Sequence, residues 1–123
     1  MKFWFLFLLL FSVSNCSVKE DKPELAVANS NINLGQIKYD STTVIQFKIY
    51  NKGYHNLIID TVSASCDCTV PDFVKKTISS SDSTILLVRY TPANLGEFKK
   101  VVVLRSNTDS VFTILKFYGK AIK

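Results

Sequence analysis

Apolar and polar residues alternate along most of the chain from residue 25 onward, which is typical of half-buried β-strands. Residues 43–50 show the pattern most clearly, because Ile45, Phe47 and Ile49 share one face and the polar residues between them share the other. We expect these three side chains to be buried. The same pattern predicts about seven strands, over residues 25–28, 32–34, 43–50, 57–64, 84–90, 98–104 and 111–118.

Turn-forming residues separate these segments at short intervals, and no segment has the period of an amphipathic helix. Short strands of this number and spacing predict an all-β fold, an immunoglobulin-like β-sandwich of two packed sheets. We expect residues 25–28 and 32–34 to form the first edge together. Pro71 and Pro92 are expected to end strands, because proline has no amide hydrogen to donate.

The first residues of the chain have the layout of an export signal. Lys2 precedes an apolar run over residues 3–11, which is too short to cross a bilayer. The small residues before Cys16 resemble a lipobox, the motif in which the cysteine becomes the new amino terminus and carries acyl chains. We therefore predict a cleavable lipoprotein signal peptide over residues 1–15 and lipidation of Cys16.

The predicted mature chain divides into a lipidated cysteine with a flexible tether, residues 16–24, and one sandwich domain, residues 25–123. This architecture places the protein in the cell envelope as an outer-membrane lipoprotein. Within the tether, Lys19-Glu20-Asp21 resembles a short signal that exports some lipoproteins of the Bacteroidota to the cell surface. The same three residues also suit a solvated spacer, so both the periplasmic and the outer face stay open.

The distribution of charge argues against a nucleic-acid partner. The chain carries a formal net charge of +5, but its only adjacent basic pairs are Lys75-Lys76 and Lys99-Lys100. A nucleic-acid site needs a clustered basic surface, so we expect none. The expected partners are the membrane, through the lipid on Cys16, and an unidentified envelope protein or glycan. A homodimer also stays open, because an exposed strand edge can pair with a second copy.

Cys66 and Cys68 are the remaining thiols, and three interpretations of this pair are open. In an extended strand their Cα atoms would lie about 6.5 Å apart, so a disulfide would need a local bend and would be readily reduced, as in a redox site. Two thiolates on one face would also suit Cu(I). Alternatively, the cysteines are small core residues or form a structural disulfide. His55 would lie about 30 Å from them and is not expected to share a site.

The residue pattern predicts neither a catalytic site nor a cofactor. A nucleophile needs a nearby base and an orienting group, but His55 is the only histidine. Asp60, Asp82 and Glu97 are expected at turns or on solvent-facing positions, where they would serve solubility. No metal site is expected beyond the cysteine pair, since too few ligands are present. The phenylalanines at predicted strand positions are expected mostly to pack in the core: Phe47, Phe98, Phe112 and Phe117.

Several runs of residues occur together in a recognisable order: Leu34-Gly35-Gln36-Ile37, Phe47-Lys48-Ile49-Tyr50-Asn51-Lys52-Gly53, Leu57-Ile58-Ile59, Ser65-Cys66-Asp67-Cys68-Thr69-Val70-Pro71, Val88-Arg89-Tyr90-Thr91-Pro92, Gly96-Glu97-Phe98 and Ser106-Asn107. The order resembles that of the domain of unknown function 1573 family of bacterial envelope proteins, over nearly all of the mature chain. The resemblance implies an immunoglobulin-like domain related to major sperm protein and Hydin-type domains. Asp67 stands where this family usually has glycine.

The resemblance implies no activity, because the family consists mainly of lipid-anchored or secreted domains without an assigned one. We therefore predict a non-catalytic, lipid-anchored binding or structural module in the envelope of a Gram-negative bacterium. It would present an immunoglobulin-like surface to a protein or glycan partner. The alternative prediction is a thiol-redox or Cu(I)-binding protein that uses Cys66 and Cys68.

Overall fold

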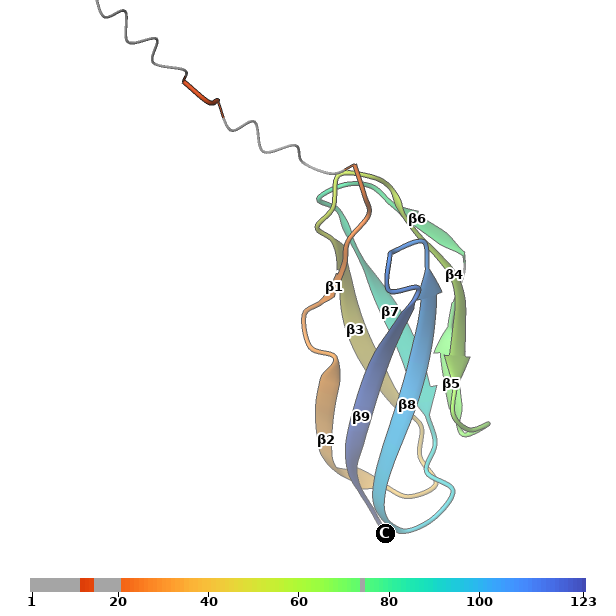
Figure 1. The fold of residues 1–123 in the computed structure, drawn as a ribbon. Helices are drawn as coiled ribbons and strands as arrows, with labels where there is room; N and C mark the ends of the chain where they lie inside the picture. Colours follow the sequence, from red (N-terminus) through yellow and green to blue (C-terminus); the bar gives the residue numbers. More distant parts are fainter. Residues whose placement is uncertain (1–11, 15–20, 74) are drawn as a thin grey trace, which may run out of the picture.

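The computed structural model describes residues 12–14, 21–73 and 75–123, and the described chain folds into a β-sandwich (Figure 1). No helix occurs among these residues, so none of the described segments is a helix that crosses a membrane. The strands are β1 (Leu25–Val27), β2 (Asn31–Lys38), β3 (Thr43–Asn51), β4 (Leu57–Ala64), β5 (Thr69–Asp72), β6 (Lys76–Ile78), β7 (Ser83–Tyr90), β8 (Gly96–Ser106) and β9 (Phe112–Ile122).

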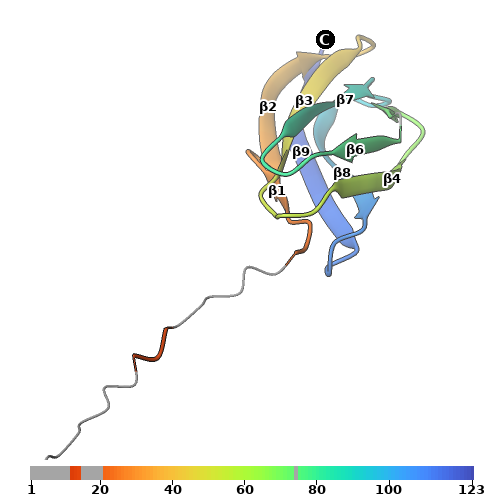
Figure 2. The same cartoon turned by 90° about the horizontal axis from the view of Figure 1, so that it is seen from above.

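The strands form two sheets. A four-stranded sheet has the order β1-β3-β7-β5, and a five-stranded sheet has the order β2-β9-β8-β4-β6. Figure 2, which views the molecule from above, shows β3 and β7 on one side of the sandwich and β8 and β9 on the other. The paired strands run antiparallel except for β2 and β9, which run parallel. The prediction of an all-β, immunoglobulin-like sandwich is confirmed.

The described residues form nine strands where the sequence predicted about seven. The two additional strands, β5 and β6, are four and three residues long, too short for the alternation of a longer strand to be visible. Pro71 lies inside β5 and does not end a strand. β5 is an edge strand that pairs only with β7, so its other side has no neighbouring strand to which an amide could donate. A proline, which has no amide hydrogen, is therefore tolerated there.

We expected the first two strands to form one edge together, but they lie in different sheets. β1 pairs with β3 at the edge of the four-stranded sheet, whereas β2 pairs with β9 at the edge of the five-stranded sheet. The chain therefore changes sheet between Val27 and Asn31 and covers one edge of each layer. The residues of β2 consequently lie beside β9, where they contribute to the outer face of the larger sheet.

Inward-facing residues of both sheets form one core. Ile45, Phe47 and Ile49 are buried, as the alternation predicts. The ring centroid of Tyr90 lies 4.7 Å from that of Phe98 and 5.1 Å from that of Phe117, so aromatic contacts join the two sheets. Burial raises the pKa of Tyr90 above its ordinary value.

Most of the strand phenylalanines lie in the core as expected, since Phe47 and Phe117 are buried and Phe98 packs against them, but the side chain of Phe112 is 60% exposed. Phe117 belongs to the same strand, β9, and is fully buried. The residue numbers of the two positions differ by an odd number, so a regular strand directs the two side chains to opposite faces. The outward position of Phe112 therefore follows from the inward position of Phe117.

The sandwich has two ends that differ in what they carry. We call one end the tethered end, because residues 22–24 enter the sandwich there. They lie beside the β3–β4 turn, where Tyr54 N–H donates to Lys22 O, and beside the β8–β9 hairpin, where Lys22 Nζ lies 3.3 Å from Asp109 Oδ2. At the other, the distal end, β7 and β9 terminate and the β4–β5 turn lies beside Thr91. Figure 1 shows the chain entering at the top and the C-terminus at the bottom.

Candidate functional site

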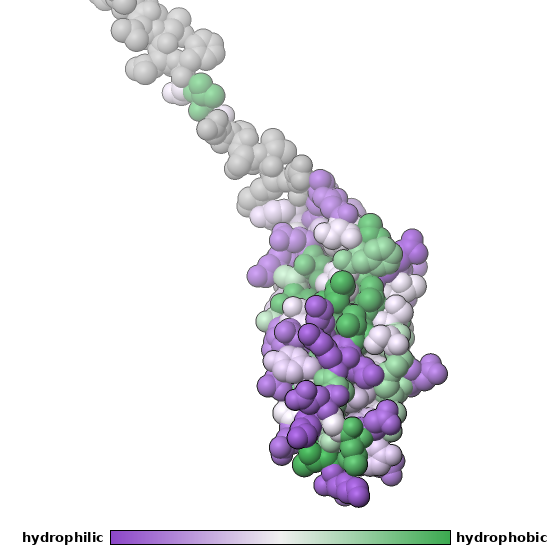
Figure 3. All heavy atoms as spheres, turned by 60° about the horizontal axis from the view of Figure 1, so that its bottom comes forward, coloured by the Kyte–Doolittle hydropathy of each residue, from purple (hydrophilic) through white to green (hydrophobic). Residues whose placement is uncertain are grey.

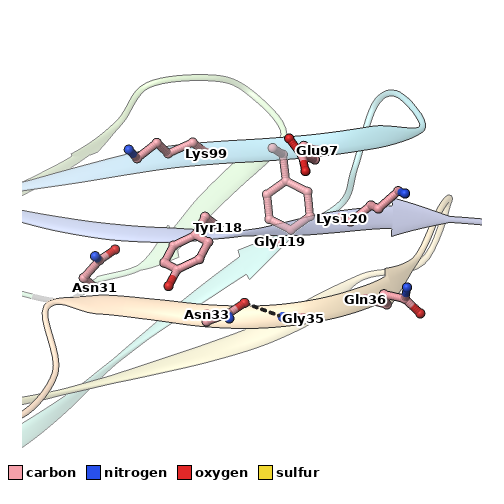
Figure 4. A pocket seen from close by; sticks show the side chains of 10 residues that line it. Asn31, Asn33, Gly35, Gln36, Glu97, Lys99, Tyr118, Gly119 and Lys120 are labelled. Atoms are coloured by element: carbon pink, nitrogen blue, oxygen red, sulfur yellow. Dashed lines mark hydrogen bonds between the residues drawn. The ribbon is translucent and has the colours of Figure 1, made fainter.

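A hollow of about 680 Å³ lies on the outer face of the five-stranded sheet near the distal end (Figure 4). Three neighbouring strands, β2, β9 and β8, form its base, so its position depends on paired backbone and not on a loop. We call it the Tyr118 hollow, and it is lined by Asn31, Asn33, Gly35, Gln36, Glu97, Phe98, Lys99, Tyr118, Gly119 and Lys120.

Tyr118 occupies the middle strand of this surface. Its cross-strand neighbours are Lys99 on β8 and Asn33 on β2. Figure 4 shows the Tyr118 ring directed toward β2, where the side chains of Asn31 and Asn33 also lie. Residues directly opposite each other on one face of a sheet lie close enough to interact, so an aromatic ring, two amides and an ammonium group share this part of the surface.

A second polar row crosses the same three strands toward the distal end. Lys120 on β9 pairs in register with Glu97 on β8 and with Gln36 on β2. Opposite charges in directly opposed positions attract each other, which favours this register. The row adds an amide, a carboxylate and a second ammonium group to the Tyr118 hollow, so the hollow contains both hydrogen-bond donors and acceptors.

A β-bulge in β2 shapes the base of the hollow. The register of β2 against β9 shifts between Asn33 and Gln36, and Gly35 has a φ of +64°, a conformation that glycine adopts without strain. Asn33 Oδ1 accepts a hydrogen bond of 2.8 Å from the Gly35 amide. A Cβ atom added to Gly119 would lie 2.5 Å from Gly35 O, so only glycine lets β9 approach the bulge this closely.

The two predicted thiols form a disulfide in the structure, with the Cα atoms of Cys66 and Cys68 5.4 Å apart. The segment between them is a turn joining β4 to β5, and not the extended strand that gave the longer expected separation. The Thr69 amide donates to Cys66 O at 3.2 Å, which closes this turn. Asp67 adopts no positive φ there, so the bend does not require the glycine usual in related sequences.

The disulfide turn lies at the distal end, between the core and solvent. Cys68 packs against the core cluster, and its carbonyl oxygen accepts a hydrogen bond of 3.0 Å from the Thr91 amide. Both cysteines are partly exposed. A hollow of about 360 Å³ beside the turn is lined by Thr42, Asp67, Cys68, Val70, Arg89 and Thr91.

His55 joins neither hollow. Cys16 lies outside the described residues. His55 lies at the tethered end, where its Nδ1 atom is 3.7 Å from Asp21 Oδ1 and both side chains are exposed. Across residues 12–14, 21–73 and 75–123, no three His, Cys, Asp or Glu side chains are grouped so that they could hold a metal ion.

Sequence reasoning missed the Tyr118 hollow and the role of Asn51. The hollow depends on the parallel pairing of β2 with β9, which residue patterns along the chain do not reveal. Asn51 is 1% exposed, and its side chain forms hydrogen bonds with four backbone groups, which the strand pattern did not predict. The signal for it was the Asn-x-Gly spacing, since an asparagine before a turn glycine commonly bonds to nearby backbone.

Comparison with known proteins places this sandwich in a family. The model of a family described as a protein of unknown function, DUF1573, matches residues 25–121. No curated protein matches the chain. The family prediction made from the sequence motifs is therefore confirmed.

Solved structures show the same fold at low identity. The PapD-like domain 7 of human CEP192 is 9% identical with a TM-score of 0.69, covering 93% of this chain and 96% of that one. A protein of unknown function from Porphyromonas gingivalis W83 is 17% identical with a TM-score of 0.71, covering 86% of this chain and 51% of that one, so this chain spans about half of it.

A third similar structure is WR4, a major sperm protein family member from C. elegans, which is 10% identical with a TM-score of 0.52 and covers 84% of this chain and 100% of that one. These likenesses confirm the predicted similarity of fold to major sperm protein and show that PapD-like domains share the same fold. Since the family model extends over nearly the whole described sandwich, the chain belongs to the DUF1573 family of proteins of unknown function.

Proposed function

We propose that this protein is a non-catalytic, lipid-anchored module of the cell envelope that presents its immunoglobulin-like surface to a glycan or protein partner. The observation that carries the proposal is the Tyr118 hollow, in which an exposed sheet face becomes a shaped polar surface. Its volume, about 680 Å³, is within the range of ordinary ligand sites. The rest of the proposal follows from the leader pattern and from the family.

The chemistry of the hollow favours a glycan as the partner. Sugars offer hydroxyl groups that both donate and accept, and amide side chains such as those of Asn31, Asn33 and Gln36 do the same. The ring of Tyr118 adds an apolar face against which sugar C–H groups can pack. A protein segment is the other class of partner, and the experiment below distinguishes the two.

The location of the hollow suits a protein held by its N-terminus. Residues 22–24 enter the sandwich at the tethered end, whereas the Tyr118 hollow lies near the distal end. With acyl chains on Cys16, the hollow would therefore lie on the part of the domain farther from the membrane. A partner in the envelope space could reach it without displacing the anchor.

Photocrosslinking in intact cells tests the proposal. A photoreactive phenylalanine analogue replaces Lys99, at the hollow, or Gln46, an exposed position on the opposite sheet that serves as the control. We expect an adduct from position 99 and none from position 46, and we expect Tyr118→Ala to abolish it. Digestion with glycan hydrolases or with proteases then identifies the partner class. Equal adducts from both positions, or adducts unaffected by Tyr118→Ala, would contradict the proposal.

A second candidate function is thiol redox chemistry at Cys66 and Cys68. It is favoured by the disulfide itself, which lies in a turn where both cysteines are partly exposed. Reduction would take two electrons and two protons from a dithiol donor and release two thiols, and Cu(I) binding would require that reduced pair. Replacing both cysteines shows which of the two candidate functions the protein has, because the binding module does not depend on the thiols.

A further inference from the structure

The β8–β9 hairpin carries a group of exposed apolar side chains at the tethered end. Phe112 is 60% exposed, Ile114 53% and Val111 39%. We call these three residues the hairpin patch. Figure 3 shows hydrophobic atoms in the upper part of the domain, a band of hydrophilic atoms below them and a second hydrophobic group at the lower end.

The patch departs from the pattern of the rest of this face. Ile114 lies directly opposite Val103, so the apolar surface crosses from β9 to β8. Further along β9 the outward positions become polar, with Lys116, Tyr118 and Lys120. The larger and more exposed apolar group of β9 therefore lies at the tethered end of the sheet, whereas Ile122 at the distal end is 36% exposed. Apolar side chains concentrated at one end of an exposed face mark a contact surface more often than isolated ones do.

Val111 is held outward by the turn of the hairpin. Its φ is 55°, in the left-handed region that β-branched residues rarely adopt. Two backbone hydrogen bonds keep it there: its amide donates to Thr108 O at 3.0 Å, and its carbonyl oxygen accepts from the Ser106 amide at 2.8 Å. The turn thus presents a valine beside Phe112 at a position where glycine or asparagine would be less strained.

The chain from the predicted anchor enters the domain next to this hairpin. Lys22 Nζ lies 3.3 Å from Asp109 Oδ2, at the tip of the hairpin. A hollow of about 180 Å³ separates the entering segment from the hairpin, and it is lined by Pro23, Glu24, Leu25, Thr108, Asp109, Ser110 and Thr113. The hairpin patch therefore lies beside the point from which the tether leaves.

The entering segment is fixed to the domain. Tyr54 N–H donates to Lys22 O and Lys52 N–H donates to Glu24 O, both at 2.9 Å. A Cβ atom at Gly53 would collide with the backbone of residues 22–24, so glycine permits this close approach. The orientation of the domain relative to residue 22 is thus set by backbone contacts, and about six residue steps connect Lys22 to Cys16 in the sequence.

The number of residues between Cys16 and Lys22 limits how far Lys22 can lie from a membrane that holds Cys16. Six residues span at most about 20 Å when fully extended. A surface held that close experiences a high effective concentration of lipid, so even a weak apolar contact becomes populated. Aromatic and aliphatic side chains at the headgroup boundary make such contacts.

We propose that the hairpin patch rests on the lipid surface and orients the domain so that its distal end points away from the membrane. This inference rests on the proposed lipid anchor at Cys16. Phe112 and Val111 enter the boundary between headgroups and acyl chains, and Ile114 follows them. Lys22 Nζ lies 3.3 Å from Asp109 Oδ2 and Arg105 Nε lies 3.8 Å from Asp60 Oδ2, so these charged groups have partners of opposite sign and the contact is expected to be mainly apolar.

Tryptophan quenching tests the contact. The only tryptophan of the sequence is in the predicted leader, so Phe112→Trp gives the mature protein a single reporter. The full chain is expressed with its leader, purified and reconstituted into phosphatidylethanolamine–phosphatidylglycerol vesicles with brominated acyl chains. We expect the emission of Phe112→Trp to fall at least about twofold relative to unbrominated vesicles, because bromine quenches only nearby rings. Leu95→Trp, at a 49% exposed position in the distal β7–β8 loop, is the control and should be unaffected.

Equal quenching of both variants, or of neither, would overturn the proposal. A third outcome would also overturn the lipid contact. If position 112 is not quenched in vesicles but is shielded from acrylamide in native membranes, a protein and not lipid covers the hairpin patch. The intact mass of the purified protein shows separately whether Cys16 is acylated. If it is not, the proposed anchor fails, and coupling the Cys16 thiol to a maleimide-bearing lipid still tests the hairpin patch.

Discussion

Asn51 is the buried polar residue on which three segments of the chain converge. Its Oδ1 atom accepts hydrogen bonds from the Glu24 and Gly53 amides, and its Nδ2 atom donates to His55 O and Ile78 O. It therefore links the entering segment, the β3–β4 turn and β6. Two of these partners are 27 residues away along the chain, one on each side. The sequence could indicate a turn at Asn51, but not these distant contacts.

Replacing this side chain should be costly. Asn51→Ala leaves backbone amides and carbonyl groups without partners in a buried site, so we expect the free energy of unfolding to fall by about 3 kcal/mol. Chemical denaturation measures the change. Asn29→Ala is the matched control, because exposed Asn29 makes one local hydrogen bond, to the Asn31 amide, and should cost less than about 0.5 kcal/mol. Similar losses in both variants would contradict the role assigned to Asn51.

At the scale of elements, the long strands were predictable because each has one buried face. β3 and β7 alternate over their whole length, so residues 43–50 and 84–90 were assigned nearly at their observed bounds. β5 and β6 were not, since four and three residues show no reliable period. The parallel pairing of β2 with β9 also could not be predicted, because it depends on the chain changing sheet after β1. The Tyr118 hollow was missed for that reason.

The disulfide turn between β4 and β5 closes a very small loop, so it constrains the unfolded chain only slightly. Replacing both residues, Cys66→Ser with Cys68→Ser, should lower the free energy of unfolding by about 1.5 kcal/mol and leave the protein folded. Denaturation of the wild-type protein under reducing conditions is the control and should show a similar loss. We also expect the photocrosslink at position 99 to persist.

The opposite result would favour the thiol candidate. The function would be assigned to Cys66 and Cys68 if the double variant folds but loses the crosslink. The same conclusion would follow if the wild-type disulfide exchanges readily with a dithiol and the variant loses a redox or copper-dependent phenotype. The binding module would then be the weaker explanation.

At the scale of the whole molecule, the structure separates two surfaces along the sandwich. The tethered end carries the hairpin patch beside residues 22–24, and the distal end carries the Tyr118 hollow and the disulfide turn. The leader and the tether are predictions that rest on local charge and hydropathy in the sequence. The separation of surfaces could not be predicted from the sequence, since it depends on which loops meet at each end.

Both proposals depend on the lipid anchor, so the most direct measurement is the intact mass of the protein isolated from its native membrane. We predict a chain that begins at Cys16, carries covalent acyl groups, and takes up two further alkyl groups, on Cys66 and Cys68, only after reduction. A chain that retains Met1, or one that lacks acyl groups at Cys16, would contradict the account.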